Sequence, residues 1–130
     1  MHPYLADTRL RKEERLLKKA DFDAVFETRQ SVGNRRMVLH WRENTLGCPR
    51  LGLVVGRKFG GAVQRNRFKR RVRELFRRNK ARLGALDVAI MPAKGPEAAA
   101  ADYDQLAEAF TALLNRLGTR RPVPGAKAEN

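Results

Sequence analysis

The sequence has few of the residues that enzyme active sites and metal sites use. Its 130 residues include one cysteine and two histidines. Cys48 therefore has neither a partner for an internal disulfide nor a second thiol for zinc. His40 has no serine and acid at a spacing typical of a hydrolytic triad, and no pair of acidic residues has the spacing of a metal site. Asp87, which begins an apolar run, fits a turn residue as well as it fits a metal ligand. We therefore expect no catalytic residue and no metal site on this chain.

Long apolar runs are absent as well. The N-terminal residues contain no apolar stretch of the kind found in signal peptides, and no segment approaches the roughly 20 apolar residues that cross a bilayer. We therefore expect a cytoplasmic protein that has no membrane contact and no obligate protein partner. The length fits one domain. We expect that domain to span residues 15–118, with flexible tails at residues 1–14 and 119–130.

Negative charge is scarce, and positive charge is concentrated in one segment. The chain has 14 acidic against 28 basic residues and a formal net charge of +14. Twelve of the basic residues and a single acidic residue, Glu74, lie between Arg57 and Arg82. This uncompensated charge exceeds what solubility requires, and it predicts a polyanionic partner.

The apolar pattern predicts both helices and strands. Apolar residues recur at helical spacing in three segments: residues 20–30, 62–83 and 102–118. Shorter apolar runs predict strands at residues 37–41, 50–56 and 86–91. Asp102 is placed to cap the third helix, and Gly84 and Gly118 are placed to end the second and third. The order of these elements predicts a small sheet covered by helices.

The second helix combines an apolar stripe with a basic surface. At 100° per residue, one side of it carries Phe68, Val72, Leu75 and Phe76, which we expect to dock the helix on the sheet. The remaining surface is basic, and like charges one turn apart destabilise a helix unless an anion compensates them. A solvated surface helix usually mixes both signs, so binding of a phosphate backbone explains this surface better. Arg57 and Lys58 precede two glycines whose backbone amides can approach an anion, although a plain turn fits these glycines too.

Aromatic residues outside this helix have two possible roles. Phe22 and Phe26 share one face of the first helix, and Met37 and Trp41 alternate with His40 along the first strand. Most such residues belong to a core. An open sheet beside a basic helix is, however, also an arrangement on which single-stranded nucleic acid stacks. The pattern leaves open whether His40 is a core residue, a surface residue or part of such a platform.

Several segments carry a family resemblance. RNRFKRRVRELFR begins at Arg65, and the segments RLLKKADFDAVFETRQSVGNRRMVL, PRLGLVVGRKFGGAVQRNR and LDVAIMPAKG surround it in consistent order. Together they resemble the bacterial ribonuclease P protein subunit, whose RNR signature matches Arg65, Asn66 and Arg67. The resemblance extends from about Arg15 to Gly118.

The resemblance implies an α+β fold, with a small mixed sheet of about four strands packed by three helices. It also implies a left-handed βαβ crossover, against the usual right-handed rule. Proteins of this family bind a catalytic RNA, and the complex removes the 5′ leader of precursor tRNA by endonucleolytic hydrolysis with Mg²⁺ at the active site of the RNA. The residues that would bind the RNA are Arg57, Lys58, Arg65, Asn66, Arg67, Lys69, Arg70, Arg73 and Arg77. Phe22, Phe26 and His40 match positions that line the cleft for the leader.

Three residues depart from the pattern of the family. The position of His40 is commonly tyrosine, so stacking there would be weaker or would depend on pH. Met37 stands where phenylalanine is common, and Gly61 stands where asparagine is common. These departures bear on the details of the expected leader contact.

Two other classes of protein share the basic surface. One is a structural RNA-binding protein of the ribosomal type, which has no processing role and needs no leader cleft. The other is a DNA-binding module, which would bind duplex DNA as tightly as RNA.

Overall fold

The computed structural model describes residues 10–120. Its helices are α2 (Lys19–Glu27), α3 (Ala62–Arg78), α4 (Lys80–Leu83), α5 (Pro96–Ala100) and α6 (Tyr103–Arg120). Its strands are β1 (Ser31–Gly33), β2 (Met37–Glu43), β3 (Arg50–Leu53) and β4 (Leu86–Pro92). Two single 3-10 turns are η1 (Lys12–Glu14) and η2 (Arg57–Phe59). Most of the expected tails, residues 1–9 and 121–130, lies outside the described residues.

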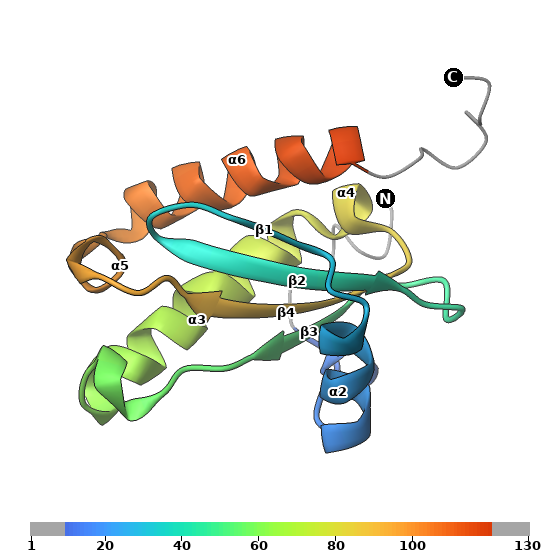
Figure 1. The fold of residues 1–130 in the computed structure, drawn as a ribbon, viewed down its shortest axis with the longest axis horizontal. Coiled ribbons are helices and arrows are strands. Elements are labelled where there is room, and N and C mark those ends of the chain that lie inside the picture. Colours follow the sequence, from blue (N-terminus) through green and yellow to red (C-terminus); the bar gives the residue numbers. More distant parts are fainter. Residues whose placement is uncertain (1–9, 121–130) are drawn as a thin grey trace.

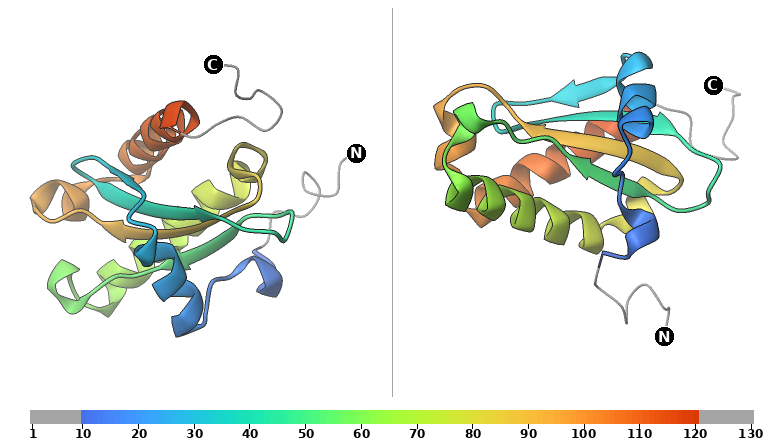
Figure 2. Two further views of the ribbon diagram at one scale, coloured as in Figure 1. Left: turned by 45° about the vertical axis from the view of Figure 1, so that its right-hand side comes forward. Right: turned by 90° about the horizontal axis from the view of Figure 1, so that it is seen from below.

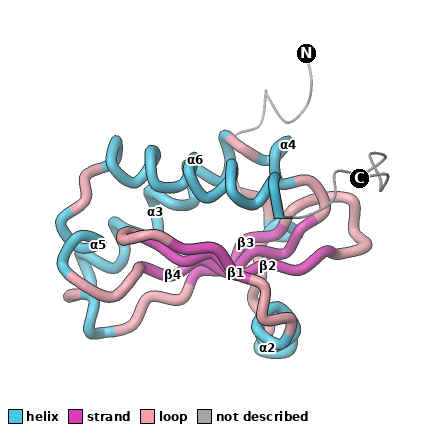
Figure 3. Tube along the Cα trace, turned by 45° about the horizontal axis from the view of Figure 1, so that its top comes forward, coloured by secondary structure: helices cyan, strands magenta, loops and turns pink. Residues whose placement is uncertain are grey.

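The four strands form one mixed sheet in the order β1-β2-β4-β3. β2 is antiparallel to β1 and β4, whereas β3 is parallel to β4. Helices α3 and α6 cover one face of the sheet, which we call the inner face, and α2 lies on the other, which we call the outer face (Figure 3). This arrangement confirms the expected α+β fold.

The connection between the two parallel strands is left-handed. In Figure 1, β3 and β4 both run from right to left, with β4 above β3. Helix α3 returns behind the sheet, as the view from below in Figure 2 shows. This sense is the reverse of the nearly universal one, so only the family resemblance, and no pattern of residues, predicts it.

The inner face carries the core. Alternate residues of the strands point to opposite faces, and those that point inward are fully or almost fully buried. They pack against α3 and α6 in one cluster that includes Met37, Leu39, Trp41, Val88, Ile90, Phe76 and Phe110. Phe68, Val72, Leu75 and Phe76 are all buried, so the predicted apolar stripe of the basic helix does dock it on the sheet. Met37 lies in this core and not on the outer face, so its departure from the family pattern concerns packing of the core.

The helices differ from the prediction at their ends. The segment predicted as one helix breaks at Asn79, whose φ of −126° and ψ of 22° are not helical and whose side chain donates to the carbonyl of Leu75. The short helix α4 then ends at Gly84, which has a φ of +60° and is the predicted stop. Asp102 caps α6 by accepting a 2.8 Å hydrogen bond from the amide of Gln105. Gly118 does not end that helix, which continues to Arg120.

Asp87 is neither a turn residue nor a metal ligand. Its buried carboxylate accepts hydrogen bonds from Arg50 at 2.8 Å, Arg42 at 3.0 Å and Asn44 at 2.9 Å. Burial alone would raise the pKa of Asp87, but these hydrogen bonds outweigh burial and lower the pKa below its ordinary value. Arg50 also approaches Asp21 at 3.5 Å. The network therefore joins three strands to each other and fastens α2 to the outer face.

A second buried ion pair fixes the N-terminal segment. Glu14 in η1 and Lys80 in α4 are both buried, and their charged groups lie 2.9 Å apart. Directly after η1, Arg15 forms a parallel bridge with Leu51, and the amide of Leu16 donates to the carbonyl of Leu51 at 2.8 Å. The contacts of the domain therefore begin before residue 15, the boundary predicted from the sequence.

Candidate nucleic-acid interface

The outward side of α3 is a basic ridge. Asn66, Arg67 and Arg70 are exposed, and Lys69 and Arg73 are half-buried. Within residues 10–120, none of the four basic side chains among these five residues forms an ion pair. The one acid of the helix, Glu74, is already engaged by Arg78 at 2.6 Å and Arg77 at 3.8 Å. The ridge is therefore left without internal neutralisation, as expected for a surface that binds an external anion.

The turn before α3 extends the ridge. Arg57 and Lys58 are exposed in η2. Arg65 donates from Nη1 to the carbonyl of Gly60 at 2.8 Å, which ties this turn to the first turns of the helix. A Cβ on Gly60 would lie 2.9 Å from the Cβ of Gln64, so glycine permits the close approach of turn and helix. Two of the predicted RNA-binding residues thus already have contacts within the protein: Arg65 with the carbonyl of Gly60, and Arg77 with Glu74.

The outer face of the sheet carries the predicted aromatic residues. The rings of Phe22 and Phe26 are nearly parallel, with centroids 6.4 Å apart. Phe26 meets His40 edge to face at a centroid distance of 4.9 Å. All three are half-buried, so they are neither sealed in the core nor fully solvated. Burial lowers the pKa of His40 below its ordinary value of 6.5, which leaves the imidazole mainly neutral at neutral pH.

Gly52 sets the distance between α2 and the sheet. A Cβ at this position would lie 2.5 Å from two ring atoms of Phe22 and 3.0 Å from the Cβ of Leu16. The phenyl ring therefore rests directly on the backbone of β3. Close packing of this kind needs a residue without a side chain.

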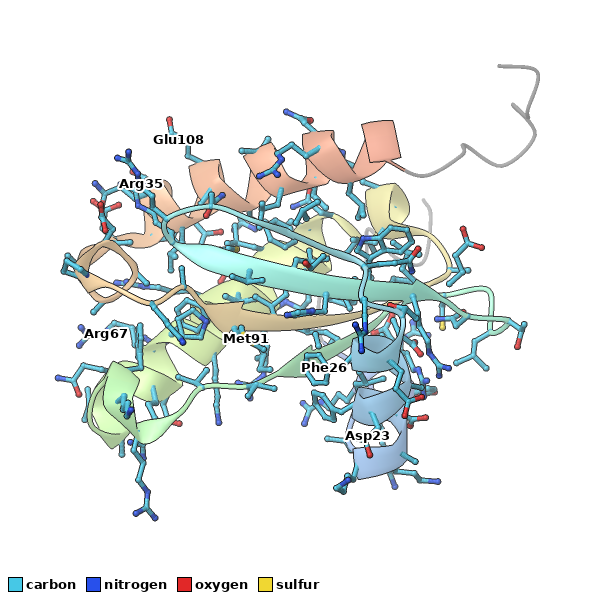
Figure 4. All side chains as sticks on the ribbon, in the orientation of Figure 1. Asp23, Phe26, Arg35, Arg67, Met91 and Glu108 are labelled. Carbon is cyan, nitrogen blue, oxygen red and sulfur yellow. The ribbon has the colours of Figure 1, made fainter. Side chains whose placement is uncertain are left out.

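The outer face continues beyond α2. Figure 4 shows Phe26 projecting from α2 toward the sheet, with Met91 farther along the strands. Val38 and Met91 are paired in register on β2 and β4, and both are half-buried. Val54, just after β3, is 40% exposed. These apolar residues were not among the site residues predicted from the sequence, although the alternation along β2 places Val38 on the same face as His40.

The interface gathers its parts from separate segments. Phe22 lines the same hollow as Lys69 and Arg73 of α3, so the aromatic residues and the basic ridge meet there. Arg67 lies on the other flank of α3, in a hollow that it shares with Arg71 and α5. Arg15, which was not predicted from the sequence, also lines the first hollow. It lies outside the basic segment, and only the bridge to Leu51 brings it beside α3.

Two further observations bear on the class of site. Among residues 10–120, no group of three or more His, Cys, Asp or Glu side chains could hold a metal ion. None of the helices in the same range is both long enough and apolar enough to span a membrane.

An α+β fold with an unneutralised basic helix and aromatic residues on an open sheet face defines a nucleic-acid-binding protein. The family model for ribonuclease P matches residues 10–118. The ribonuclease P protein component of Pseudomonas putida strain GB-1 is 40% identical over 121 residues, which cover 92% of this chain and 89% of that protein. The component of Thermotoga sp. strain RQ2 is 39% identical over 109 residues, which cover 82% of this chain and 93% of that protein.

Solved structures agree with these relatives. The RNase P protein of Staphylococcus aureus matches with a TM-score of 0.75 and 29% identity, over 83% of this chain and 98% of that one. The RNase P protein of Thermotoga maritima matches with a TM-score of 0.71 and 40% identity, over 79% of this chain and 96% of that one. The chain belongs to the ribonuclease P protein family. It is accordingly a subunit of a ribonucleoprotein endonuclease of tRNA processing, and it associates with the RNA subunit of that enzyme.

Proposed function

We propose that the outer face of the sheet binds the single-stranded 5′ leader of precursor tRNA. Phe22, Phe26 and His40 supply the aromatic surface, and the strip through Val38 and Met91 extends it along the strands. Aromatic side chains stack on any base, whereas cations follow the backbone. The platform therefore suits a leader whose sequence varies from one precursor to the next.

The basic ridge of α3, extended by Arg57 and Lys58, binds the catalytic RNA in this proposal. Among residues 10–120, the exposed cations at its centre, Arg67 and Arg70, form no ion pair, so RNA phosphates can replace their hydration without breaking one. Hydrolysis takes place on the RNA with Mg²⁺ bound there, and the protein contributes affinity for the substrate. The place of action we propose is the cytoplasm.

The observation that carries the proposal is the open, half-buried aromatic pair beside unneutralised cations. Its test is Phe26→Ala, measured as affinity for precursor tRNA by the complex of protein and catalytic RNA. Loss of one stacked base costs about 1–3 kcal/mol, which corresponds to roughly 5-fold to 150-fold weaker binding of a substrate with a long leader. A substrate with a minimal leader should bind as it does to the wild type.

The matched control is Tyr103→Ala. Tyr103 is a half-buried aromatic residue that packs against the core cluster of the inner face, away from α2. Its truncation tests whether any partial loss of packing weakens binding. An equal loss of affinity in both variants, or a loss with Phe26→Ala that does not depend on leader length, would contradict a leader site on the outer face.

The ridge has a separate test. Arg67→Ala and Arg70→Ala should each weaken binding to the catalytic RNA and reduce the slope of log K against log salt by about one unit, if each removes one phosphate contact. Arg78→Ala is the control, because Arg78 lies on the same helix but is paired with Glu74. We expect a smaller change for Arg78→Ala, and three equal slopes would argue against a ridge of specific contacts.

A further inference from the structure

Two polar side chains fasten the C-terminal end of α2 to β2. The hydroxyl of Thr28 lies 3.0 Å from the carbonyl oxygen of Trp41, and Nε2 of Gln30 donates to the same oxygen at 3.1 Å. The hydroxyl also accepts a hydrogen bond from the amide of Gln30 at 3.2 Å. In return, the amide of Trp41 donates to the carbonyl of Gln30 at 3.1 Å. We call these contacts of Thr28, Gln30 and Trp41 the α2–β2 clamp.

The clamp also reaches back into the last turn of α2. The hydroxyl of Thr28 lies 2.8 Å from the carbonyl oxygen of Val25. A hydroxyl has one proton to donate, so Thr28 shares it between this helix carbonyl and the strand carbonyl of Trp41. Val25 itself is buried against Leu16 and Ala89. Apolar burial is non-directional, whereas hydrogen bonds depend on angle. Val25 therefore holds α2 on the sheet, and the clamp fixes the direction of its last turn.

The backbone bends sharply between the two clamp side chains. Arg29 has a φ of +57° and is the one non-glycine residue among residues 10–120 with a positive φ. Such a conformation costs free energy, and it persists where surrounding contacts determine it. The bend returns the amide of Gln30 to the hydroxyl of Thr28. The clamp therefore holds the chain in a conformation that it would otherwise rarely adopt.

The clamp lies beside the aromatic contact of the outer face. In the sequence, His40 directly precedes Trp41, and Phe26 lies two residues before Thr28. The rings of Phe26 and His40 meet at 4.9 Å with an interplanar angle of 75°. Contacts between rings depend on their relative orientation. His40 lies on β2, which has a neighbouring strand on each side, so a change in the direction of α2 would move Phe26 relative to a fixed His40.

We infer that Thr28 and Gln30 are positioning residues that hold Phe26 at the angle to His40 at which the two rings accept a base of the leader. Both act through the direction of the last turn of α2. The use of this angle by the leader rests on the proposed function. The control of the angle by the clamp does not, so it can be tested on the protein alone.

The first test follows His40 by proton NMR during a pH titration. The chain has two histidines, so His40→Gln identifies the signals of His40. Burial lowers the pKa of His40 from 6.5, and Phe26 is one of the groups that cover it. Thr28→Val keeps the shape of the side chain and removes the hydroxyl, so the pKa of His40 should rise toward 6.5 and the signals of its ring should shift. Thr28→Ser, which keeps the hydroxyl, should retain the wild-type values.

The double variant Thr28→Val/Gln30→Ala removes both side-chain donors to the carbonyl of Trp41. It should raise the pKa of His40 at least as far as Thr28→Val does. Circular dichroism checks that each variant is folded. If the signals and the pKa of His40 were the same in the double variant as in the wild type, the clamp would not control the angle and the inference would be overturned.

Asn34→Ala is the matched control. The side chain of Asn34 donates to the carbonyl of Ala109 in α6 at 3.0 Å and accepts from the amide of Arg36 at 3.0 Å. It therefore also joins a helix to the sheet through polar contacts, but away from α2. Asn34→Ala should lower the free energy of unfolding and leave the signals of His40 unchanged. Equal changes at His40 in Asn34→Ala and Thr28→Val would show a general loosening and would overturn the inference.

The second test measures the affinity of the complex of protein and catalytic RNA for precursor tRNA. Thr28→Val should weaken binding of a substrate with a long leader by about fivefold, the lower end of what one stacked base contributes. Binding of a substrate with a minimal leader should not change, and Thr28→Ser should restore the wild-type affinity for the long leader.

The outcomes separate this inference from the proposed leader site. If Phe26→Ala weakens binding of the long leader and Thr28→Val does not, the leader site stands and its positioning by the clamp is refuted. If neither variant has an effect that depends on leader length, the leader site itself fails. In that case the titration of His40 still decides whether the clamp sets the angle between the two rings.

Discussion

Substituting Gly52 by alanine tests how closely α2 must approach the sheet. The new Cβ would lie 2.5 Å from two ring atoms of Phe22, whereas ordinary contacts begin near 3.4 Å. The ring would have to move by about 1 Å to restore an ordinary contact. Leu16 restricts the space for this movement, because its Cβ would lie only 3.0 Å from the new Cβ. Overpacking of this kind typically costs about 1–3 kcal/mol. We expect the free energy of unfolding to fall by that amount. We also expect weaker binding of substrates that have a long leader.

Urea unfolding measures the first effect. With a typical slope of about 1–3 kcal/mol per molar urea, the midpoint should fall by roughly 1 M at unchanged slope. Gly56→Ala is the control, because nothing lies within 4 Å of its added Cβ and its φ of −84° suits any residue. The double variant Gly52→Ala/Phe22→Ala should lose less than the sum of the two single losses. If Gly52→Ala were as stable as Gly56→Ala, or if the two losses simply added, the reasoning would be refuted.

Three further predictions concern buried or half-buried charges. Asp87→Asn should lower the free energy of unfolding at pH 7 by about 3 kcal/mol, because it removes the buried carboxylate and leaves the half-buried Arg42 and Arg50 with Asp21 as the counter-charge that remains in contact. Since the folded pKa of Asp87 is lowered, its contribution is present above the ordinary carboxyl pKa of 3.8 and is lost as the pH falls through the folded value, so the difference between the two proteins in urea unfolding should shrink as the pH falls below 3.8. Because the pKa of His40 is lowered in the folded protein, the unfolded chain binds a proton at His40 more readily than the folded protein does. The free energy of unfolding should therefore decline as the pH falls below about 6.5, and His40→Gln should make this decline with pH smaller. Lys80→Met should lower the free energy of unfolding more than Glu14→Gln/Lys80→Met, because the single change leaves the buried carboxylate of Glu14 without its ammonium partner, although the amide of Arg11 still donates to it; equal losses in the two variants would contradict this.

Local patterns in the sequence predicted the parts of the fold that depend on local physics. The stripe from Phe68 to Phe76 has helical period, so its burial could be inferred before any contact was known. The role of Asp102 as a cap followed from residue type and position in the same way. Both features depend on residues only a few positions apart.

Features that depend on distant residues were not visible in the sequence. The break at Asn79 is an exception, because its contact with Leu75 is local; it was missed because the apolar period continues to Leu83 on the other side of it. Asp87 looked like a turn residue or a ligand because its partners, Arg42 and Arg50, come from two other strands. The hand of the crossover likewise required the family resemblance, since local pattern favours the opposite hand.

The same distinction between local and distant contacts applies to the candidate interface. The basic ridge could be predicted almost entirely, because it lies on one helix whose charges are adjacent in sequence. The aromatic pair of Phe22 and Phe26 was predicted as a shared face, but its position over Gly52 was not. Arg15 was not predicted, because only its backbone bridge to Leu51 of β3, which forms in the folded chain, places it beside α3.

The most direct test of the central claim is cleavage of precursor tRNA at low Mg²⁺ by the catalytic RNA of ribonuclease P, with and without this protein. Substrates with long and with minimal leaders should be compared. A leader platform on the outer face predicts that the protein stimulates cleavage, and that it does so more strongly for the long leader. Stimulation that is the same for both substrates, or none from an RNA shown to be active at high Mg²⁺, would contradict it.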